Sequence, residues 1–273
     1  MSSMHFSNLT YNSLLKMFSK DKRFDGRKLI EQRDFTIEYD VSNKAEGSAR
    51  VRMGKTEVVV GVKLEVGAPY PDSRDKGNLM VSGDLLPLAS PRFESGPPKF
   101  AAIELPRLID RMVRESHVID LKKLVIVENE KVWVVIIDVY PINDDGNLIG
   151  AASIATAAAL LETHIPELDE NGMIDHDKKA TKKLPLETGV IPLSFTFYKL
   201  GDSLLVDPTR EEEEACDGKI VWGISNYKGK EHMIHSAQKG LEATMSSEDI
   251  AKMMKELPKL FDDTLKKLKK FLK

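Results

Sequence analysis

The chain has 273 residues, of which 41% are hydrophobic and 30% charged, a balance typical of folded globular proteins and not of disordered or membrane-embedded ones. This length predicts one large domain or two ordinary ones. The net charge of -3 excludes a general attraction to polyanions, so any contact with nucleic acid must come from a local basic patch.

The single cysteine, Cys216, excludes an internal disulfide framework and indicates a reducing compartment. The first 20 residues lack the basic start and long apolar core of a signal peptide. No later run reaches membrane-spanning length. We therefore expect a cytoplasmic protein without membrane contact.

Residues 1–22 are predicted to form a short helical extension that is not part of a core. Residues 35–41 read as an extended stretch. Residues 48–53 and 57–66 alternate in polarity around Gly54-Lys55 and predict a hairpin. The Gly54-Lys55-Thr56 triplet is similar to the end of a phosphate-binding P-loop, but an expected glycine is Ala49 and a strand follows, so we exclude that motif.

Residues 67–99 are rich in Pro, Gly, Asp, Ser and Arg, which predicts two loops flanking a strand at 79–88. Loops on a rigid sheet often carry recognition. Tyr70, Arg74 and Lys76 are candidates for a basic surface there, and the alternative is that they are simple exposed loop residues.

Residues 101–120 predict an amphipathic helix, whose apolar stripe consists of Leu105, Leu108, Ile109, Met112 and Val113. Arg107, Arg111 and Arg114 fall on the opposite side, with the first two about 6 Å apart along the axis. Such an arginine ridge suits a phosphodiester backbone; a merely solvated face is the alternative. Because proline is tolerated in a first turn, Pro106 places the expected helix start near residues 103–105.

Residues 123–128 and 131–140 predict a strand pair, the second strand so apolar that we expect it to be covered on both faces. Residues 148–163 are small and apolar all round, which predicts a helix buried on every side with an Asp or Asn cap. The turn before it contains only Gly146-x-x-x-Gly150, and Asp144 and Asp145 would repel an anion. We interpret this turn as capping chemistry.

The second half begins after a polar segment at 167–185 that we interpret as a linker. Strands are expected at 189–200, 203–206, 219–225 and 231–236. A capping box at Ser246 to Asp249 then starts a long helix, broken or bent at Pro258. Both halves run strands first and helix last, which predicts two α+β domains forming a pseudo-repeat, at 23–166 and 186–273.

Candidates for catalysis are few. The histidines His5, His117, His164, His176, His232 and His235 show no metal-ligand spacing. His232 and His235 lie three apart on a predicted strand and should point to opposite faces. Cys216 has no base arranged near it in the sequence. The acidic run at 211–214 could bind a divalent ion together with Asp207, although four adjacent acids are more often a solvated turn. We expect neither a cofactor nor a metal.

Five ordered motifs resemble the RNase PH family of phosphorolytic 3′-to-5′ ribonucleases. They are DGR at 25–27, AEGSARVRMGKTEVVVGVKLE at 45–65, ELPRLIDRMVR at 104–114, DDG at 144–146 and LLVDPTREEEEACDGKIVWGIS at 204–225. The resemblance spans nearly the whole chain. It implies a layered sandwich of two α+β domains, the first like the second domain of ribosomal protein S5, and six subunits in a ring around a channel for single-stranded RNA.

The sequence departs from the catalytic pattern of that family at three places. Ala101 stands where catalytic members have a phosphate-binding arginine, and Asn147-Leu148-Ile149 stands where they have Gly-Thr-Arg. Their two aspartates six apart, followed by Ser-Ala-Ala, correspond to Asp207 and Glu213 followed by Glu214-Ala215-Cys216. Each charge-assisted hydrogen bond to phosphate is worth about 1.5–3 kcal/mol. These changes should abolish a phosphorolytic pocket.

The combination is similar to the non-catalytic RNase PH-like subunit of the archaeal exosome. That resemblance implies a catalytic RNase PH-like paralogue as partner, in heterodimers assembled as a trimer of dimers, together with RNA-binding cap proteins. It also implies single-stranded RNA contacts by Arg107 and Arg111, with Arg114 as a weaker member. Two alternatives remain: an active exoribonuclease using Asp207 and Glu213 with a divalent ion, and an RNA-binding module without a nuclease partner.

Overall fold

The computed structural model describes residues 7–170, 172–175, 178, 180–227 and 231–271. The first half contains α1 (Asn8–Phe18), β1 (Phe35–Tyr39), β2 (Gly47–Met53), β3 (Thr56–Gly67), β4 (Asn78–Gly83), α2 (Phe100–Glu115), the 3-10 turn η1 (Leu121–Leu124), β5 (Val125–Val127), β6 (Lys131–Asn143) and α3 (Leu148–Glu162). The second half contains β7 (His164–Ile165), β8 (Lys182–Lys183), β9 (Pro192–Leu200), β10 (Ser203–Val206), α4 (Arg210–Ala215), β11 (Gly218–Tyr227), β12 (Glu231–Leu241) and α5 (Ser247–Lys269). None of the described helices is both long and apolar enough to cross a membrane.

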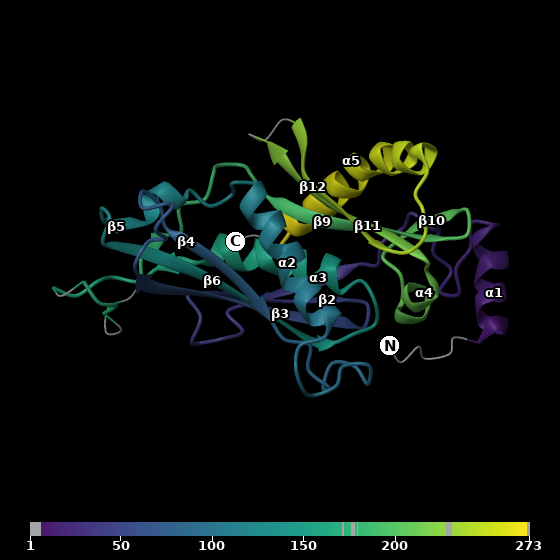
Figure 1. Cartoon of the computed structure of the whole chain (residues 1–273), viewed down its shortest axis with the longest axis horizontal. Coiled ribbons are helices and arrows are strands. Elements are labelled where there is room, and N and C mark those ends of the chain that lie inside the picture. The colour runs from purple at the N-terminus through teal and green to yellow at the C-terminus, as the bar shows by residue number, and fades with distance from the viewer. Residues whose placement is uncertain (1–6, 171, 176–177, 179, 228–230, 272–273) are drawn as a thin grey trace.

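Two sheets enclose a layer of helices (Figure 1). The first sheet has the order β1-β2-β3-β6-β4, with β5 paired to β6, and only the β4–β6 pair is parallel. The second is antiparallel in the order β10-β9-β11-β12. Helix α3 packs on β2 and β3 of one sheet and on β9 of the other, while α5 packs on β9. The α+β prediction and the fully buried α3 are thus confirmed.

The hairpin of β2 and β3 is confirmed, with Met53 paired to Thr56 around the two-residue turn. Strand β6 corrects a prediction, because it is covered on one face only. Val135, Ile137 and Val139 are buried, whereas Ile136 and Asp138 are partly exposed. The helices of this chain pack on a single face of the first sheet, so the other face is open. The predicted strand at 79–88 is also shorter, since β4 ends at Gly83.

The N-terminal helix is not the expected appendage. Leu14 and Phe18 of α1 are buried, and they form a second hydrophobic cluster with Tyr198, Leu200 and Leu205 of the second sheet. The sequence before residue 20 carries no sign of the surface, almost 200 residues away, that covers these two side chains.

Two prolines lie inside helices. Helix α2 begins at Phe100, so the expected start near residues 103–105 is wrong and Pro106 is an internal residue. Proline removes one backbone donor, but the buried stripe of α2 continues through this turn and holds the helix on the core. Helix α5 likewise runs unbroken from Ser247 to Lys269 through Pro258, and the predicted Ser246–Asp249 capping box is present.

The carboxylate of Asp207, which follows β10, joins the two halves. Arg33 donates from Nη2 to Oδ1 (2.8 Å) and from Nε to Oδ2 (3.0 Å), and Arg27 donates from Nη1 to Oδ2 (2.8 Å). The N-cap of α3, Asn147, donates from Nδ2 to Oδ1 (2.8 Å). Beside it Arg23 forms a buried ion pair with Glu212. Both sheets are therefore locked to the segment at residues 23–33.

Burial by itself would raise the pKa of Asp207, but the hydrogen bonds and charge of Arg33 outweigh it and hold this pKa below its usual range. An acid with a lowered folded-state pKa stabilises the fold above its unfolded pKa of about 3.9. That stability is lost as the pH falls through the folded-state value.

We predict that Asp207→Asn lowers the free energy of unfolding at neutral pH by about 3 kcal/mol, because two partly buried guanidiniums lose the buried carboxylate that they share and keep only the more exposed Asp25 and Asp145. The measurement is urea denaturation at pH 7 and at pH values below 4. The difference between variant and wild type should shrink at the acidic end. Asp202→Asn, which changes an exposed acid in the same half, should be neutral; an equal loss in both variants would contradict the prediction.

Candidate nucleic-acid interface

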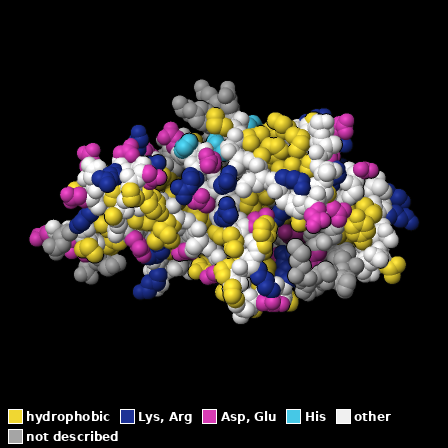
Figure 2. All heavy atoms as spheres, in the orientation of Figure 1, with side chains coloured by type: hydrophobic (Ala, Val, Ile, Leu, Met, Phe, Trp, Pro, Cys, Tyr) yellow, Lys and Arg dark blue, Asp and Glu magenta, His cyan; other side chains and the backbone are white. Residues whose placement is uncertain are grey.

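The arginine face of α2 is exposed as predicted. Leu105, Leu108, Ile109, Met112 and Val113 are all buried, and they anchor α2 against β4 and α3. Arg107, Arg111 and Arg114 are exposed on the other side. Figure 2 shows Lys and Arg side chains gathered over the region where α2 lies in Figure 1. We call this surface, formed by these three residues, the arginine ridge.

The three arginines differ in charge compensation. Arg114 is paired with Asp110 and donates to the Leu79 carbonyl oxygen (3.0 Å), so its guanidinium is fixed and partly neutralised. Arg107 and Arg111 have no ion pair or side-chain hydrogen bond with any residue in the described part of the chain. Their charges are therefore available to an external anion.

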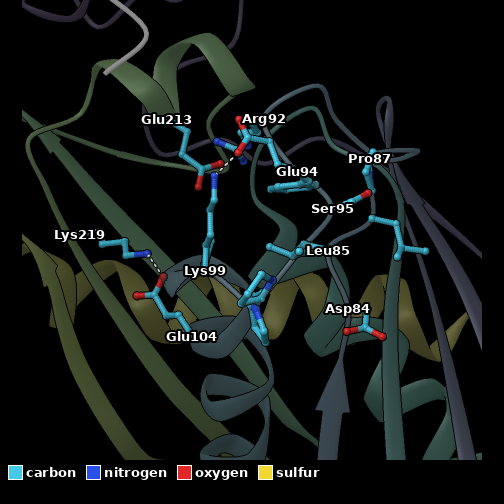
Figure 3. Close-up of a pocket in the computed structure, with 17 residues that line it drawn as sticks. Asp84, Leu85, Pro87, Arg92, Glu94, Ser95, Lys99, Glu104, Glu213 and Lys219 are labelled. Atoms are coloured by element: carbon cyan, nitrogen blue, oxygen red, sulfur yellow. Dashed lines mark hydrogen bonds and ion pairs between the residues drawn. The ribbon is translucent and has the colours of Figure 1, made fainter. Parts of the chain in front are cut away.

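A cavity of about 520 Å³ opens at the N-terminal end of α2 (Figure 3). Its charged lining residues are Asp84, Arg92, Glu94, Lys99, Glu104, Glu213 and Lys219. Each of the three cations is paired with a carboxylate: Arg92 with Asp144 (2.7 Å), Lys219 with Glu104 (2.7 Å), and Lys99 with Glu94. The cavity therefore presents no uncompensated positive charge.

Ala101 and Glu213 both lie in the wall of this cavity. A methyl group stands at the first position and a carboxylate at the second, so neither offers a donor to an anion. Glu213 accepts from the Asn147 backbone N–H (3.0 Å) and from the Tyr198 hydroxyl (3.1 Å). Burial raises the pKa of Glu213, and Arg92 counteracts this only in part. Burial and the neighbouring Glu213 raise the pKa of Tyr198 well above its usual range.

The acidic run at 211–214 is not a solvated turn, so that interpretation is wrong. It forms α4, with a capping box between Thr209 and Glu212, and Glu212 is buried against Arg23. Asp207 already accepts from Arg27, Arg33 and Asn147, which leaves its carboxylate no capacity for a cation. No cluster of metal-ligating residues exists among the described residues, 7–271 apart from the gaps given above.

The side chains of His232 and His235 are hydrogen-bonded to residues outside the arginine ridge, and Cys216 is buried. His232 bonds Asp262 of α5 (2.8 Å), whereas His235 bonds Ser225 (2.6 Å) and lies near the end of α2. The prediction that the side chains of His232 and His235 point to opposite faces of β12 is thus confirmed. Burial raises the pKa of Cys216 well above its usual range, as do nearby acids, which makes its thiol a poor nucleophile. His5 and His176 lie outside the described residues.

Sequence reasoning missed Arg92, Glu104 and Lys219 as members of one cavity. Glu104 and Lys219 are 115 residues apart and meet only because α2 packs against β11. Arg92 lies in a Pro- and Gly-rich loop where an arginine has no periodicity to mark it. Only the order of motifs shared with a known family could have brought these positions together.

The sequence and the fold are similar to those of known proteins. Residues 31–166 match domain 1, and residues 191–256 match domain 2, of the 3′ exoribonuclease family RNase PH. The exosome complex component Rrp42 of Methanothermobacter thermautotrophicus is 41% identical over 245 residues, covering 89% of this chain and 88% of the relative. Rrp42 of Thermococcus kodakarensis is 40% identical over 244 residues, with shares of 89% and 88%.

Among solved structures, a chain of the Archaeoglobus fulgidus exosome with RNA bound to the active site has a TM-score of 0.83 and 38% identity, covering 97% of this chain and 98% of that one. A chain of an archaeal exosome core has a TM-score of 0.83 and 33% identity, with shares of 96% and 97%. Rice Rrp46, 18% identical with a TM-score of 0.61, shares the fold alone. The chain belongs to the RNase PH family of 3′ exoribonucleases and consists of two RNase PH-like domains.

Proposed function

We propose that this protein is a non-catalytic subunit of an archaeal exosome, which shapes the active site of a catalytic paralogue and holds the RNA backbone beside it. The names of its relatives support the exosome assignment. The observation that carries the division of labour is a contrast along α2. Arg107 and Arg111 are uncompensated at its surface, whereas the cations of the cavity at its N-terminal end are all paired with carboxylates.

Phosphorolysis needs a pocket that accepts inorganic phosphate, which carries about two negative charges at neutral pH. The cavity is lined by the carboxylates of Asp84, Glu94, Glu104 and Glu213 against three cations. A phosphate ion could enter only by breaking an ion pair such as Lys219–Glu104 and leaving a partly buried acid unpaired. The site is therefore unsuited to binding the attacking group.

The arginine ridge is suited to a different task. Two guanidiniums about 6 Å apart along a rigid helix can contact successive phosphates without any contact to the bases. Such contacts position a chain and carry no sequence information. This subunit thus contributes contacts to the RNA phosphates that do not depend on the RNA sequence. Arg107 and Arg111 make most of them, and the paired Arg114 contributes less.

The partners follow from the same proposal. A catalytic RNase PH-like paralogue supplies the reactive site, the two alternate as a trimer of heterodimers, and cap proteins deliver single-stranded RNA in the cytoplasm. The domain boundaries at residues 22, 166 and 185 also stay a prediction. An active nuclease using Asp207 and a divalent ion is disfavoured, because the cation would have to displace Arg27 and Arg33 from that carboxylate.

We predict that Arg107→Ala combined with Arg111→Ala weakens binding of a labelled oligoadenylate about tenfold. It should also reduce the slope of log K against log salt concentration by about 1.4, since each phosphate contact on a single strand contributes about 0.7. Fluorescence anisotropy over a salt series measures both quantities. Arg52→Ala removes an exposed arginine that is paired with Glu57 on the first sheet, so it should leave the slope unchanged. Equal effects of both changes would contradict a specific ridge.

We also predict that this chain alone does not shorten the 3′ end of single-stranded RNA, with or without phosphate. Mixed with a catalytic paralogue from the same source, it should support phosphate-dependent shortening that the double arginine variant reduces. Gel analysis of end-labelled RNA over time measures the rate. Phosphate-dependent activity of the isolated chain would overturn the non-catalytic assignment, and activity that requires a divalent ion would favour the Asp207 alternative.

A further inference from the structure

A second cavity, of about 590 Å³, lies at the C-terminal end of the arginine ridge. The loop between β3 and β4 forms one side, through Tyr70 and Lys76, and Arg114 of α2 forms the other. Arg114 thus belongs both to the ridge and to this cavity. In Figure 2 hydrophobic surface flanks the basic row over the region of β4.

Hydrogen bonds of the backbone and of one side chain hold the loop between β3 and β4 in one conformation. The Asn78 side chain donates from Nδ2 to the Ala68 carbonyl oxygen (2.9 Å) and so joins the two ends of the loop. The Ser73 N–H donates to the Tyr70 carbonyl oxygen (3.0 Å), which closes a turn. The Gly77 N–H donates to the Leu121 carbonyl oxygen (2.8 Å). A side chain at Gly77 would not fit, because its Cβ would lie 2.8 Å from the Trp133 carbonyl oxygen. The loop is therefore arranged before any ligand arrives.

Tyr70 is 47% exposed, although it borders a cavity and an ordered loop. Its ring has no hydrogen-bond or aromatic partner among the described residues. The guanidinium of Arg114 lies near enough for the two groups to influence each other electrostatically, and it is fixed by Asp110 and Leu79. An exposed aromatic ring in a cavity that also contains basic side chains is an arrangement with which proteins bind unpaired bases.

The cavity keeps one cation, Lys76, free for an anion. Lys76 and Arg114 line it, and Asp72, which accepts a hydrogen bond from the Ser73 hydroxyl, is the acid among its described lining residues. Lys76 has no ion pair with a described residue. Unlike the acidic cavity at the other end of α2, this one keeps a cation available.

We propose that the cavity is a nucleotide subsite, in which Tyr70 stacks on one base of a single-stranded RNA while Lys76 and Arg114 contact the adjoining phosphate. This inference rests on the proposed RNA role of the ridge and adds a binding site for one further nucleotide. It also explains why Arg114 is fixed: its task is to present a guanidinium beside the ring. Stacking adds binding energy to this end of the ridge through a contact with the base, and this energy does not depend on the salt concentration.

The test uses the full-length chain assembled with its catalytic paralogue, with Tyr70→Ala and the conservative Tyr70→Phe. Stacking on an aromatic ring is worth about 1–3 kcal/mol per base, so Tyr70→Ala should weaken binding of a labelled oligoadenylate about fivefold or more. The salt slope should not change, and Tyr70→Phe should bind like wild type. Lys76→Ala should instead reduce the slope by about 0.7.

A second ligand isolates the base contact. An oligomer of the same length with every base removed should bind wild type less tightly, and Tyr70→Ala should cost nothing further with this ligand. Phe24→Ala, a change in a similarly exposed aromatic residue of the domain junction, is the matched control and should leave both affinities unaltered. Unchanged thermal melting of each variant shows that folding is intact.

The outcomes separate this inference from the proposed function. If Arg107→Ala with Arg111→Ala weakens binding but Tyr70→Ala does not, the nucleotide subsite is refuted and the ridge stands. If Tyr70→Ala weakens the base-free oligomer equally, the ring acts without stacking and the inference is again wrong. If the double arginine variant binds normally, the RNA role of the ridge fails, and the subsite fails with it.

Discussion

The carboxylate of Asp207 is the constraint on which the rest of the structure depends. It receives hydrogen bonds from Arg27 and Arg33 of the N-terminal segment and from the cap of α3, so a single buried group connects both sheets and the central helix. Removing a partner from such a group is costly because the remaining charges stay buried. The same bonds occupy both carboxylate oxygens of Asp207. In this chain an acidic position that sequence alone could assign to a metal is committed to holding the domains together.

The position of α2 follows from that junction. Helix α3, fixed at its first residue by Asn147, fills the space between the two sheets, and α2 packs against α3, β4 and the edge of the second sheet. One helix therefore has two neighbouring environments. Its N-terminal end is surrounded by acids of both halves, while Arg107 and Arg111 on its outer face have no ion pair or side-chain hydrogen bond with a described residue. Paired charges at one end of α2 and unpaired arginines on its outer face thus lie within the same helix.

Sequence reasoning recovered most of the fold, because strands and helices here follow their hydrophobic periods. The hairpin at Gly54-Lys55, the buried α3 and the face of Arg107 and Arg111 all depend on local pattern. The failures involve distant partners. Glu212 and Glu213 look alike in a run of four acids, yet one is paired with Arg23 and the other meets Tyr198. Likewise the acidic cavity requires Lys219 to reach α2, and Pro106 lies inside a helix whose buried stripe starts next to it at Leu105.

The unequal compensation of the arginines has a kinetic meaning. The protein carries a net charge of -3, so its far field repels a polyanion from most directions, and the repulsion weakens at places where neighbouring cations lack ion-pair partners. Arg107 and Arg111 are such a place. In the proposed RNA role, a polyanion would be steered towards α2 and repelled by the acidic surfaces. The distribution of charges would thus set the direction from which the polyanion approaches, before any contact is made.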